Sequence, residues 1–416
     1  MKITNIEARE ILNSRGMPTL ECTITLDGGK ACVTASVPSG ISVSSKEAKH
    51  LFDGGNRLGG KGVTKAISLI HDIIAPELLG STPQLKEIDE YLCSLDSSEQ
   101  KETYGANTLL AVSIASAKAQ AYNEGLYVCE LLSFYSDTEA MSIPYPMINV
   151  INGGMHAFQG LSIQEYMIVP LGAESFRESM EIAAEIVIQL GKLLKKSGKN
   201  CFIGQEGGYV SEFASEEEPL ELISQAVTLA GCQEGVVSLA LDCAATHFYD
   251  AETKLYTIHK KRMNTEELIK WYGDIAERYN IYSLEDPFAE EDEDGWQMIM
   301  NALGENLYIV GDDLFATNPS YVMRGISEGL ANSALIKPDQ IGTVTEAISA
   351  VEVCKTYGMA TTASHRSGET EDNFIVDFAI GLSLGQLKAG GLLAGGHVDK
   401  YNHALRMEEK LTMQTF

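Results

Sequence analysis

The amino-acid sequence predicts an α/β protein in which a barrel of parallel βα units follows a smaller α+β domain. Three observations support this prediction. The chain has 416 residues, of which 44% are apolar, so it can bury sizeable cores and is long enough for two domains. Its first part alternates like a β-meander followed by helices. From about residue 145, short apolar strands alternate with amphipathic helices, which is typical of parallel strands covered by helices.

The N-terminal region begins with a predicted antiparallel meander. Residues 3–10 and 18–26 alternate between apolar and polar side chains, and a third strand follows the turn at 27–30. The segment 39–45 is small and polar with few packing anchors, so we expect a mobile loop there.

Three helical patterns follow this loop, at 62–79, 84–94 and 105–123. The third is apolar on nearly all faces, which predicts a buried helix. We therefore expect an N-terminal α+β domain over residues 1–125 and a barrel domain over residues 140–416.

The barrel region carries recognisable helix starts. Ser175 is a predicted N-cap for a helix to residue 196, and Asn264 or Thr265 caps a helix that ends at 279. Asn318 followed by Pro319 begins another helix, and a further one is predicted over 217–231. The predicted strands lie at 201–205, 236–242, 281–286, 307–312, 333–337, 359–365 and 385–388.

Charge and cysteine usage exclude several classes of protein. A formal charge of −27 argues against broad binding to nucleic acid or to anionic membranes. No apolar run approaches the length of a membrane span, and the N-terminus lacks an apolar signal region. The eight cysteines are scattered without a C-x-x-C pair, which predicts reduced thiols in a cytoplasmic protein.

The most informative feature is the polar residue that ends each predicted barrel strand. These residues are Asp242, Glu285, Asp312, Lys337, His365 with Arg366 and Ser367, and Lys388. One such residue alone is commonly a solvated boundary residue. In a barrel, however, the carboxyl ends of the strands meet at one mouth, where active sites lie.

Clustered carboxylates repel one another unless a cation lies among them, and oxygen ligands without Cys or His favour Mg²⁺. We expect depressed pKa values for the two lysines beside that cation, so that one of them can act as a neutral base.

Two glycine-rich turns add candidates. The first, 152–156, ends in His156, and Glu165 follows nine residues later; a lone loop histidine is more often structural. The second, 204–208, holds Glu206 between glycines that let a substrate approach the backbone, which suggests a proton donor. A plain turn acid is the alternative interpretation of Glu206.

At this point the sequence resembles the enolase family along nearly the full chain. The matching stretches, in the family's order, include EILNSRGMPTLE, GANTLLAVSIA, NVINGGMHA, QEGG, LEDPF, VGDDLFATN, LIKPDQIGT and SHRSGETEDNFI. The resemblance implies a modified eightfold, TIM-type barrel whose first units depart from the usual βα order. It also implies a hydro-lyase that dehydrates 2-phosphoglycerate reversibly to phosphoenolpyruvate with two Mg²⁺ per active site, as part of glycolysis and gluconeogenesis.

The resemblance further implies residue roles. Lys337 matches the base that removes the proton next to the carboxylate, and Glu206 matches the acid that protonates the leaving hydroxyl, with Glu165 as its partner. The implied metal ligands are Asp242, Glu285, Asp312 and, for the second ion, Ser42. The implied substrate contacts are His156, Glu165, His365, Arg366, Ser367 and Lys388.

The chain departs from the family in several places. The loop at 39–44 reads SGISVS where the family has SGASTG, Gln205 replaces an Asp, and Asp339 replaces an Asn. The run Ala394–His397 replaces Arg-Ser-Glu-Arg, whose acid pairs in the family with the arginine matching Arg15 across a dimer interface. A homo-oligomer, dimer or higher, is still expected, although this contact is altered.

Two other functions stay open at this stage. One is a dehydratase acting on a related phosphorylated or phosphonylated hydroxy acid. The other is a non-catalytic binding protein with an enolase-like fold. For localisation we expect the cytoplasm, with a secondary cell-surface or secreted pool as the alternative.

Overall fold

The computed structural model describes residues 1–40, 44–136, 138, 140–157 and 160–414. The predicted N-terminal meander consists of β1 (Ile3–Leu12), β2 (Pro18–Leu26) and β3 (Ala31–Ser36), paired antiparallel in chain order. Alternate side chains of β2, such as Leu20 and Ile24, are fully buried, because one face of the sheet packs on a helix.

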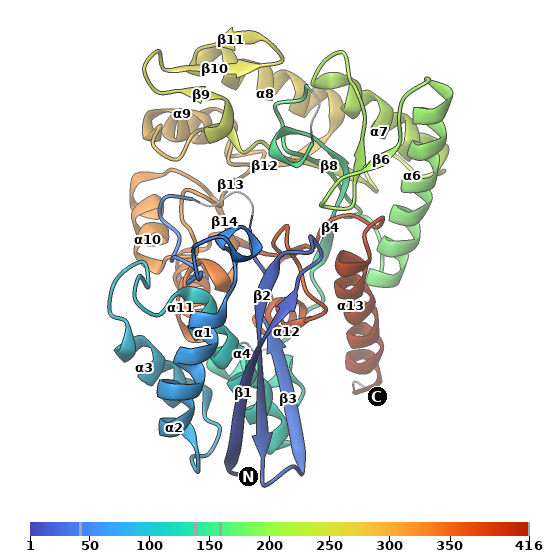
Figure 1. Ribbon diagram of the computed structural model, residues 1–416. Helices are drawn as coiled ribbons and strands as arrows, with labels where there is room; N and C mark the ends of the chain where they lie inside the picture. Colours follow the sequence, from blue (N-terminus) through green and yellow to red (C-terminus); the bar gives the residue numbers. More distant parts are fainter. Residues whose placement is uncertain (41–43, 137, 139, 158–159, 415–416) are drawn as a thin grey trace.

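The helices of this region follow the meander. They are α1 (Thr64–Leu69), α2 (Ala75–Leu78), α3 (Leu85–Leu95), α4 (Ala106–Glu124) and α5 (Val128–Tyr135). As predicted, α4 is buried along most of its length. It contacts β2 and β3 and also α11 (Val344–Tyr357) of the barrel, so it joins the sheet to the rest of the molecule (Figure 1).

Eight strands close into the predicted barrel, which confirms the fold class. The ring runs β4, β5, β8, β12, β13, β14, β15 and β16, and β16 pairs back to β4. Their bounds are β4 (Tyr145–Asn152), β5 (Glu165–Val169), β8 (Ser238–Asp242), β12 (Ile281–Glu285), β13 (Tyr308–Gly311), β14 (Ser333–Ile336), β15 (Ala360–Ser364) and β16 (Gln386–Lys388). Only β5 runs antiparallel to its ring neighbours, so the first unit departs from βα order as the resemblance implied.

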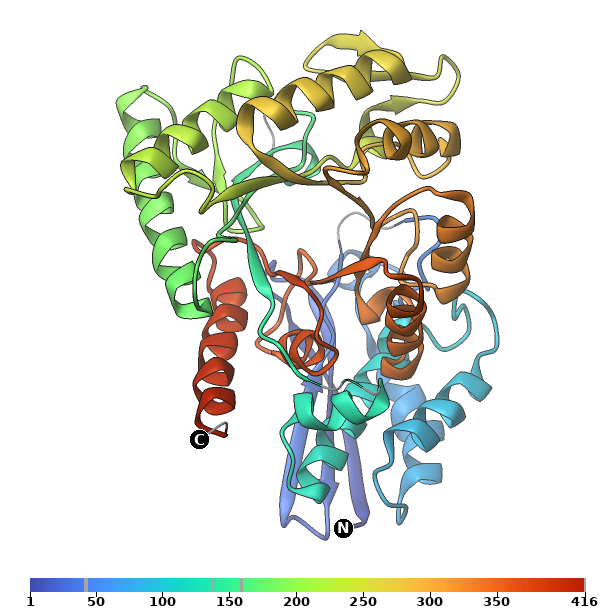
Figure 2. The ribbon, with the colours of Figure 1, turned by 180° about the vertical axis from the view of Figure 1, so that it is seen from behind.

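Helices surround the ring (Figure 2). They are α6 (Phe176–Lys196), α7 (Glu217–Leu229), α8 (Thr265–Tyr279), α9 (Glu293–Leu303), α10 (Pro319–Glu328), α11 (Val344–Tyr357), α12 (Phe374–Gly381) and α13 (Gly395–Gln414). The predicted caps are present: Ser175 accepts a hydrogen bond from the Glu178 amide, Asn264 from that of Glu267, and Asn318 precedes Pro319.

Some predicted elements differ from the observed ones. The strand expected at 201–205 is only β6 (Phe202–Ile203), which pairs with β7 (Tyr209–Val210) and lies outside the ring. Glu206 therefore sits in the turn between β6 and β7 and not at the end of a barrel strand. A small sheet of β9 (Tyr249–Asp250), β10 (Leu255–Ile258) and β11 (Lys261–Met263) was not predicted, because its strands are too short to show an alternating pattern.

The expectation of few anchors around 39–45 is wrong for the described flanks of that loop. Ser39 exchanges backbone hydrogen bonds with Gly368. Ser44 is buried, and its hydroxyl donates to Glu290 at 2.6 Å. Ser42 lies outside the described residues. No helix of the described chain is both long and apolar enough to span a bilayer.

Candidate active site

The polar residues predicted at the strand ends meet at the barrel mouth. Asp242 pairs in register with Glu285, and Ser364 pairs with Lys388, because parallel strands align their carboxyl ends. One pocket is lined by most of the predicted residues, namely His156, Glu165, Glu206, Asp242, Asp312, Lys337, His365, Arg366, Ser367 and Lys388. Glu285 is not among the lining residues, but it accepts hydrogen bonds from Lys388, which is.

Lys388 lies at the centre of this charge cluster. Its ammonium donates to Asp242 Oδ2 at 2.8 Å and to both oxygens of Glu285 at 2.8 Å, and it lies 3.2 Å from Glu165 Oε2. All four side chains are buried. A cationic group therefore already stands between the carboxylates predicted to bind metal.

The donor set suits a hard divalent cation. Asp242, Glu285 and Asp312 offer only oxygen ligands, they are buried, and Lys388 shows that a cation fits between the first two. The carboxylate of Asp312 is turned instead toward Lys337 and Gln340, whose amide donates to it at 2.9 Å. Among the described residues, Asp312 forms its close acidic cluster with Asp286 and Asp313, and not with the predicted pair.

We expected lowered pKa values for Lys337 and Lys388. With the protein groups alone and no bound cation, this expectation is wrong. Burial lowers the pKa of Lys337, but the combined attraction of the nearby carboxylates, Asp312 first and then Glu285, raises it overall. The pKa of Lys388 is likewise raised, because Asp242 and Glu165 outweigh burial. In both lysines the pKa is raised by neighbouring carboxylates. A bound divalent cation would offset the negative charge of those carboxylates and so weaken this effect.

The pKa values of Glu206 and Glu165 are shifted in opposite directions. Burial raises the pKa of Glu206, and the charge of Glu165 raises it further. Burial also acts on Glu165, but Lys388 and His156 outweigh it and lower its pKa. His156 Nδ1 lies 3.4 Å from Glu165 Oε1 and 3.5 Å from Glu206 Oε1, so it links the two carboxyl groups. Shifts in opposite directions favour one protonated acid and one carboxylate in the same pocket.

Arg366 is held by two acids on the far side of the pocket. Its Nη1 lies 3.0 Å from Glu47 Oε2 and 2.9 Å from Asp339 Oδ2, and all three side chains are buried. Asp339 is one of the departures noted in the sequence. The pairing fixes the plane of the guanidinium, and it also reduces the net positive charge offered to an anion.

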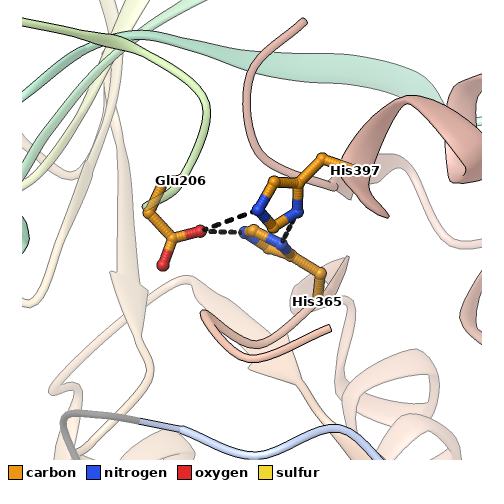
Figure 3. Close-up of side chains that lie close together, drawn as sticks. All are labelled: Glu206, His365 and His397. Carbon is orange, nitrogen blue, oxygen red and sulfur yellow. Dashed lines mark hydrogen bonds and ion pairs between the residues drawn. The ribbon is translucent and has the colours of Figure 1, made fainter. Parts of the chain in front are cut away.

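Sequence reasoning missed several residues of the site, among them Asp286 and Asp313, which line the pocket, and Glu47, which pairs with Arg366. His397, in the first turn of α13, lies against His365 and Glu206 (Figure 3). The sequence marked His397 only as part of a run that differs from the family. Its distance of nine residues from Lys388, across a loop, gave no sign that the chain returns to the pocket there.

Comparison with known proteins agrees with this geometry. The profile described as "Enolase, N-terminal domain" matches residues 3–132, and that described as "Enolase, C-terminal TIM barrel domain" matches residues 140–416. The chain belongs to the enolase family. A curated relative, the enolase of Mycobacteroides abscessus, is 43% identical over 411 residues, which cover 98% of this chain and 94% of that protein.

Membership of the enolase family confirms the resemblance and the prediction of a hydro-lyase, phosphopyruvate hydratase. It also implies a divalent metal ion, in agreement with the oxygen-rich donor set of the pocket.

Proposed function

We propose that this enolase dehydrates 2-phosphoglycerate to phosphoenolpyruvate, with Lys337 as the base and Glu206 as the acid. The observation that supports this most is that both groups line one pocket, where burial raises the pKa of the Glu206 carboxyl. Lys337 takes the proton from the carbon next to the substrate carboxylate. Glu206 gives its proton to the hydroxyl on the next carbon, which leaves as water.

The remaining polar residues bind and orient the substrate. Arg366 and Ser367 are suited to the phosphate, and Lys388 to the carboxylate, with His156 and His365 enclosing the reacting carbons. We propose Asp242, Glu285 and Asp312 as ligands of a tightly held Mg²⁺ and Ser42 as a ligand of a second. When bound, these ions supply positive charge that stabilises the doubly charged carboxylate formed on proton loss.

We further propose a cytoplasmic role in glycolysis and gluconeogenesis and a homodimeric or higher assembly. All eight cysteines are free in the structure, which supports a reducing compartment.

The test follows product formation by ultraviolet absorbance with purified protein, 2-phosphoglycerate and saturating Mg²⁺. We expect Lys337→Ala and Glu206→Gln each to lower kcat by about 10²–10⁴-fold, the range typical of lost acid–base catalysis. Lys270→Ala is the matched control, because that lysine is exposed on α8, where it pairs with Asp274. No product from the wild-type protein would overturn the proposal.

Exchange of the substrate's C2 hydrogen with solvent deuterium separates the two roles. Glu206→Gln retains the base, so it is expected to exchange hydrogen without releasing product. Lys337→Ala is expected to lose both exchange and product. The opposite pattern would reverse the assignment of base and acid.

A second candidate is a dehydratase of a related phosphorylated or phosphonylated hydroxy acid. The observation that favours it is the pairing of Arg366 with both Glu47 and Asp339, which changes the charge presented to the anion. A higher kcat/KM on such an analogue than on 2-phosphoglycerate would establish this alternative.

A further inference from the structure

His397 closes a buried chain of polar groups that ends at Glu206. His365 Nδ1 and His397 Nδ1 lie 3.0 Å apart, and the two rings meet edge to face with centroids 4.7 Å apart. His397 Nε2 lies 3.1 Å from the backbone oxygen of Gln205, and His365 Nε2 lies 3.2 Å from Glu206 Oε2. The side chains of Glu206, His365 and His397 are all at most 4% exposed, and they come from three different elements (Figure 3).

The backbone around His397 is fitted to its ring. A Cβ atom at Gly390 would lie 2.7 Å from His397 Cγ, and the φ of Gly390 is +81°, so a larger residue is doubly disfavoured there. The Gly391 amide donates to the Glu206 carbonyl at 2.6 Å, and that of Leu393 donates to the Gly207 carbonyl at 3.2 Å. These bonds tie the turn that carries Glu206 to the segment that leads into His397.

The hydrogen bond between His397 and the Gln205 backbone carbonyl determines where the hydrogens lie on both histidine rings. A backbone carbonyl only accepts hydrogen bonds, so His397 Nε2 carries hydrogen toward Gln205. In neutral His397 the Nδ1 atom is then bare and accepts from Nδ1–H of His365. Neutral His365 is left with a bare Nε2, which faces Glu206 Oε2. Only a protonated Glu206 carboxyl has a hydrogen to offer that nitrogen.

We propose that His397 is a positioning residue that fixes the tautomer of His365 and thereby holds Glu206 in its protonated, acid form. The inference rests on the proposed function, in which Glu206 is the proton donor. His397 also lies beside the acid itself, with Nε2 3.9 Å from Glu206 Oε2, where a charged His397 would lower the pKa of Glu206. The proposed effect therefore belongs to neutral His397 and runs through His365. If His397 were lost, His365 could place hydrogen on Nε2 and stabilise the Glu206 carboxylate instead.

A transition metal in this cluster is the main competing interpretation, because Glu206, His365 and His397 offer ligand atoms within 4.8 Å of one another. The hydrogen bonds argue against it. Both nitrogens of His397 and Nδ1 of His365 already have partners in the protein, so only one ring nitrogen is left to bind an ion.

Other charged groups also face Glu206 and contribute to its titration. His156 lies 3.5 Å from its other oxygen, and the charges of Glu165, Lys388 and Arg15 reach it as well. These groups stay in place when His397 is replaced, so a comparison of variants isolates the part that His397 plays.

The first experiment observes the tautomer directly, by NMR of the Mg²⁺-loaded wild-type protein labelled with ¹⁵N-histidine. We expect a nitrogen–nitrogen coupling across one imidazole–imidazole hydrogen bond, with hydrogen on His365 Nδ1 and none on His365 Nε2. Hydrogen on His365 Nε2, a charged His365, or loss of the coupling through a bound metal would overturn the proposal. This measurement requires neither turnover nor a folded variant.

The second experiment compares His397→Phe with His403→Phe, the same change on the same helix at a histidine that pairs with Asp377. We expect His397→Phe to lower kcat by about tenfold with little change in KM, and to move the alkaline limb of the kcat–pH profile about one pH unit lower. His403→Phe should leave both unchanged. An unchanged pH profile in His397→Phe would overturn the inference.

The outcomes of the two proposals are distinguishable. A wild-type protein that shows the expected tautomer but does not turn over 2-phosphoglycerate would refute the proposed function alone. An active wild-type protein whose pH profile is unaffected by His397→Phe would refute only the role of His397.

Discussion

At the residue scale, burial changes the titration of Asp89, a side chain with no ion-pair partner among the described residues. Asp89, on α3, is fully buried, and its carboxyl accepts a hydrogen bond from the Thr345 amide at 2.9 Å. Burial raises the pKa of Asp89 to about 7, far above its ordinary value. Unlike the acids of the pocket, Asp89 lies near no lysine or arginine that pairs with it among the described residues.

This shift predicts a pH-dependent stability. The unfolded chain releases the Asp89 proton near pH 4, whereas the folded chain keeps it up to about pH 7, so the free energy of unfolding falls as the pH rises through that window. Asp89→Asn removes the effect. We expect the fall in the free energy of unfolding between pH 5 and pH 8, measured with urea, to be smaller in the variant by about 2–3 kcal/mol.

The exposed Asp274→Asn serves as the control for this comparison, because its side chain lies on the surface of α8. Its pH dependence should match that of the wild-type protein. Parallel curves for wild type and Asp89→Asn would show that Asp89 is ionised in the folded protein throughout.

At the scale of elements, the sequence predicted those features of the fold that depend on local patterns. Helix starts at Ser175, Asn264 and Asn318 were predictable because capping depends on neighbouring residues alone. The gathering of Asp242, Lys337 and Lys388 followed from strand order in a barrel. The pairing of Arg366 with Glu47, and the return of His397 to Glu206, depend on loop paths across more than 190 residues and have no local signal.

The approach of the 39–40 segment to Arg366 leads to a prediction about one glycine. A Cβ atom at Gly40 would lie 2.0 Å from Arg366 Nη2, and Glu47 and Asp339 hold that guanidinium in place. We therefore expect Gly40→Ala to displace Arg366 and to lower kcat/KM for the phosphorylated substrate by about tenfold or more.

Gly273→Ala is the matched control, because the added Cβ would meet only Leu303 at an ordinary 3.6 Å and alanine favours the helix. Steady-state kinetics of both variants make the comparison. If Gly40→Ala has wild-type kcat/KM, Arg366 does not need its observed position to bind substrate.

At the scale of the whole molecule, the distribution of charge is uneven. The chain carries −27 overall, yet Lys337, Arg366 and Lys388 are concentrated in one buried pocket. Acidic side chains such as Glu87 and Glu90 on α3, by contrast, are exposed to solvent. Buried carboxylates offset the cations of the pocket, so divalent cations bound there would be needed to attract an anionic substrate to a protein that as a whole repels anions.

The same excess of negative charge bears on self-association. Two copies that each carry −27 repel one another at long range, and Gly396 stands where the family resemblance would place an acidic partner for Arg15. Salt shortens the range of this repulsion to about 10 Å at 0.1 M, whereas it would weaken a contact held by ion pairs. If the proposed dimer is held mainly by apolar packing, KCl should therefore strengthen it.

We expect the dimer dissociation constant from sedimentation velocity to fall by about threefold or more between 20 and 300 mM KCl. A rise in that constant with salt would instead place attractive charge pairs at the interface.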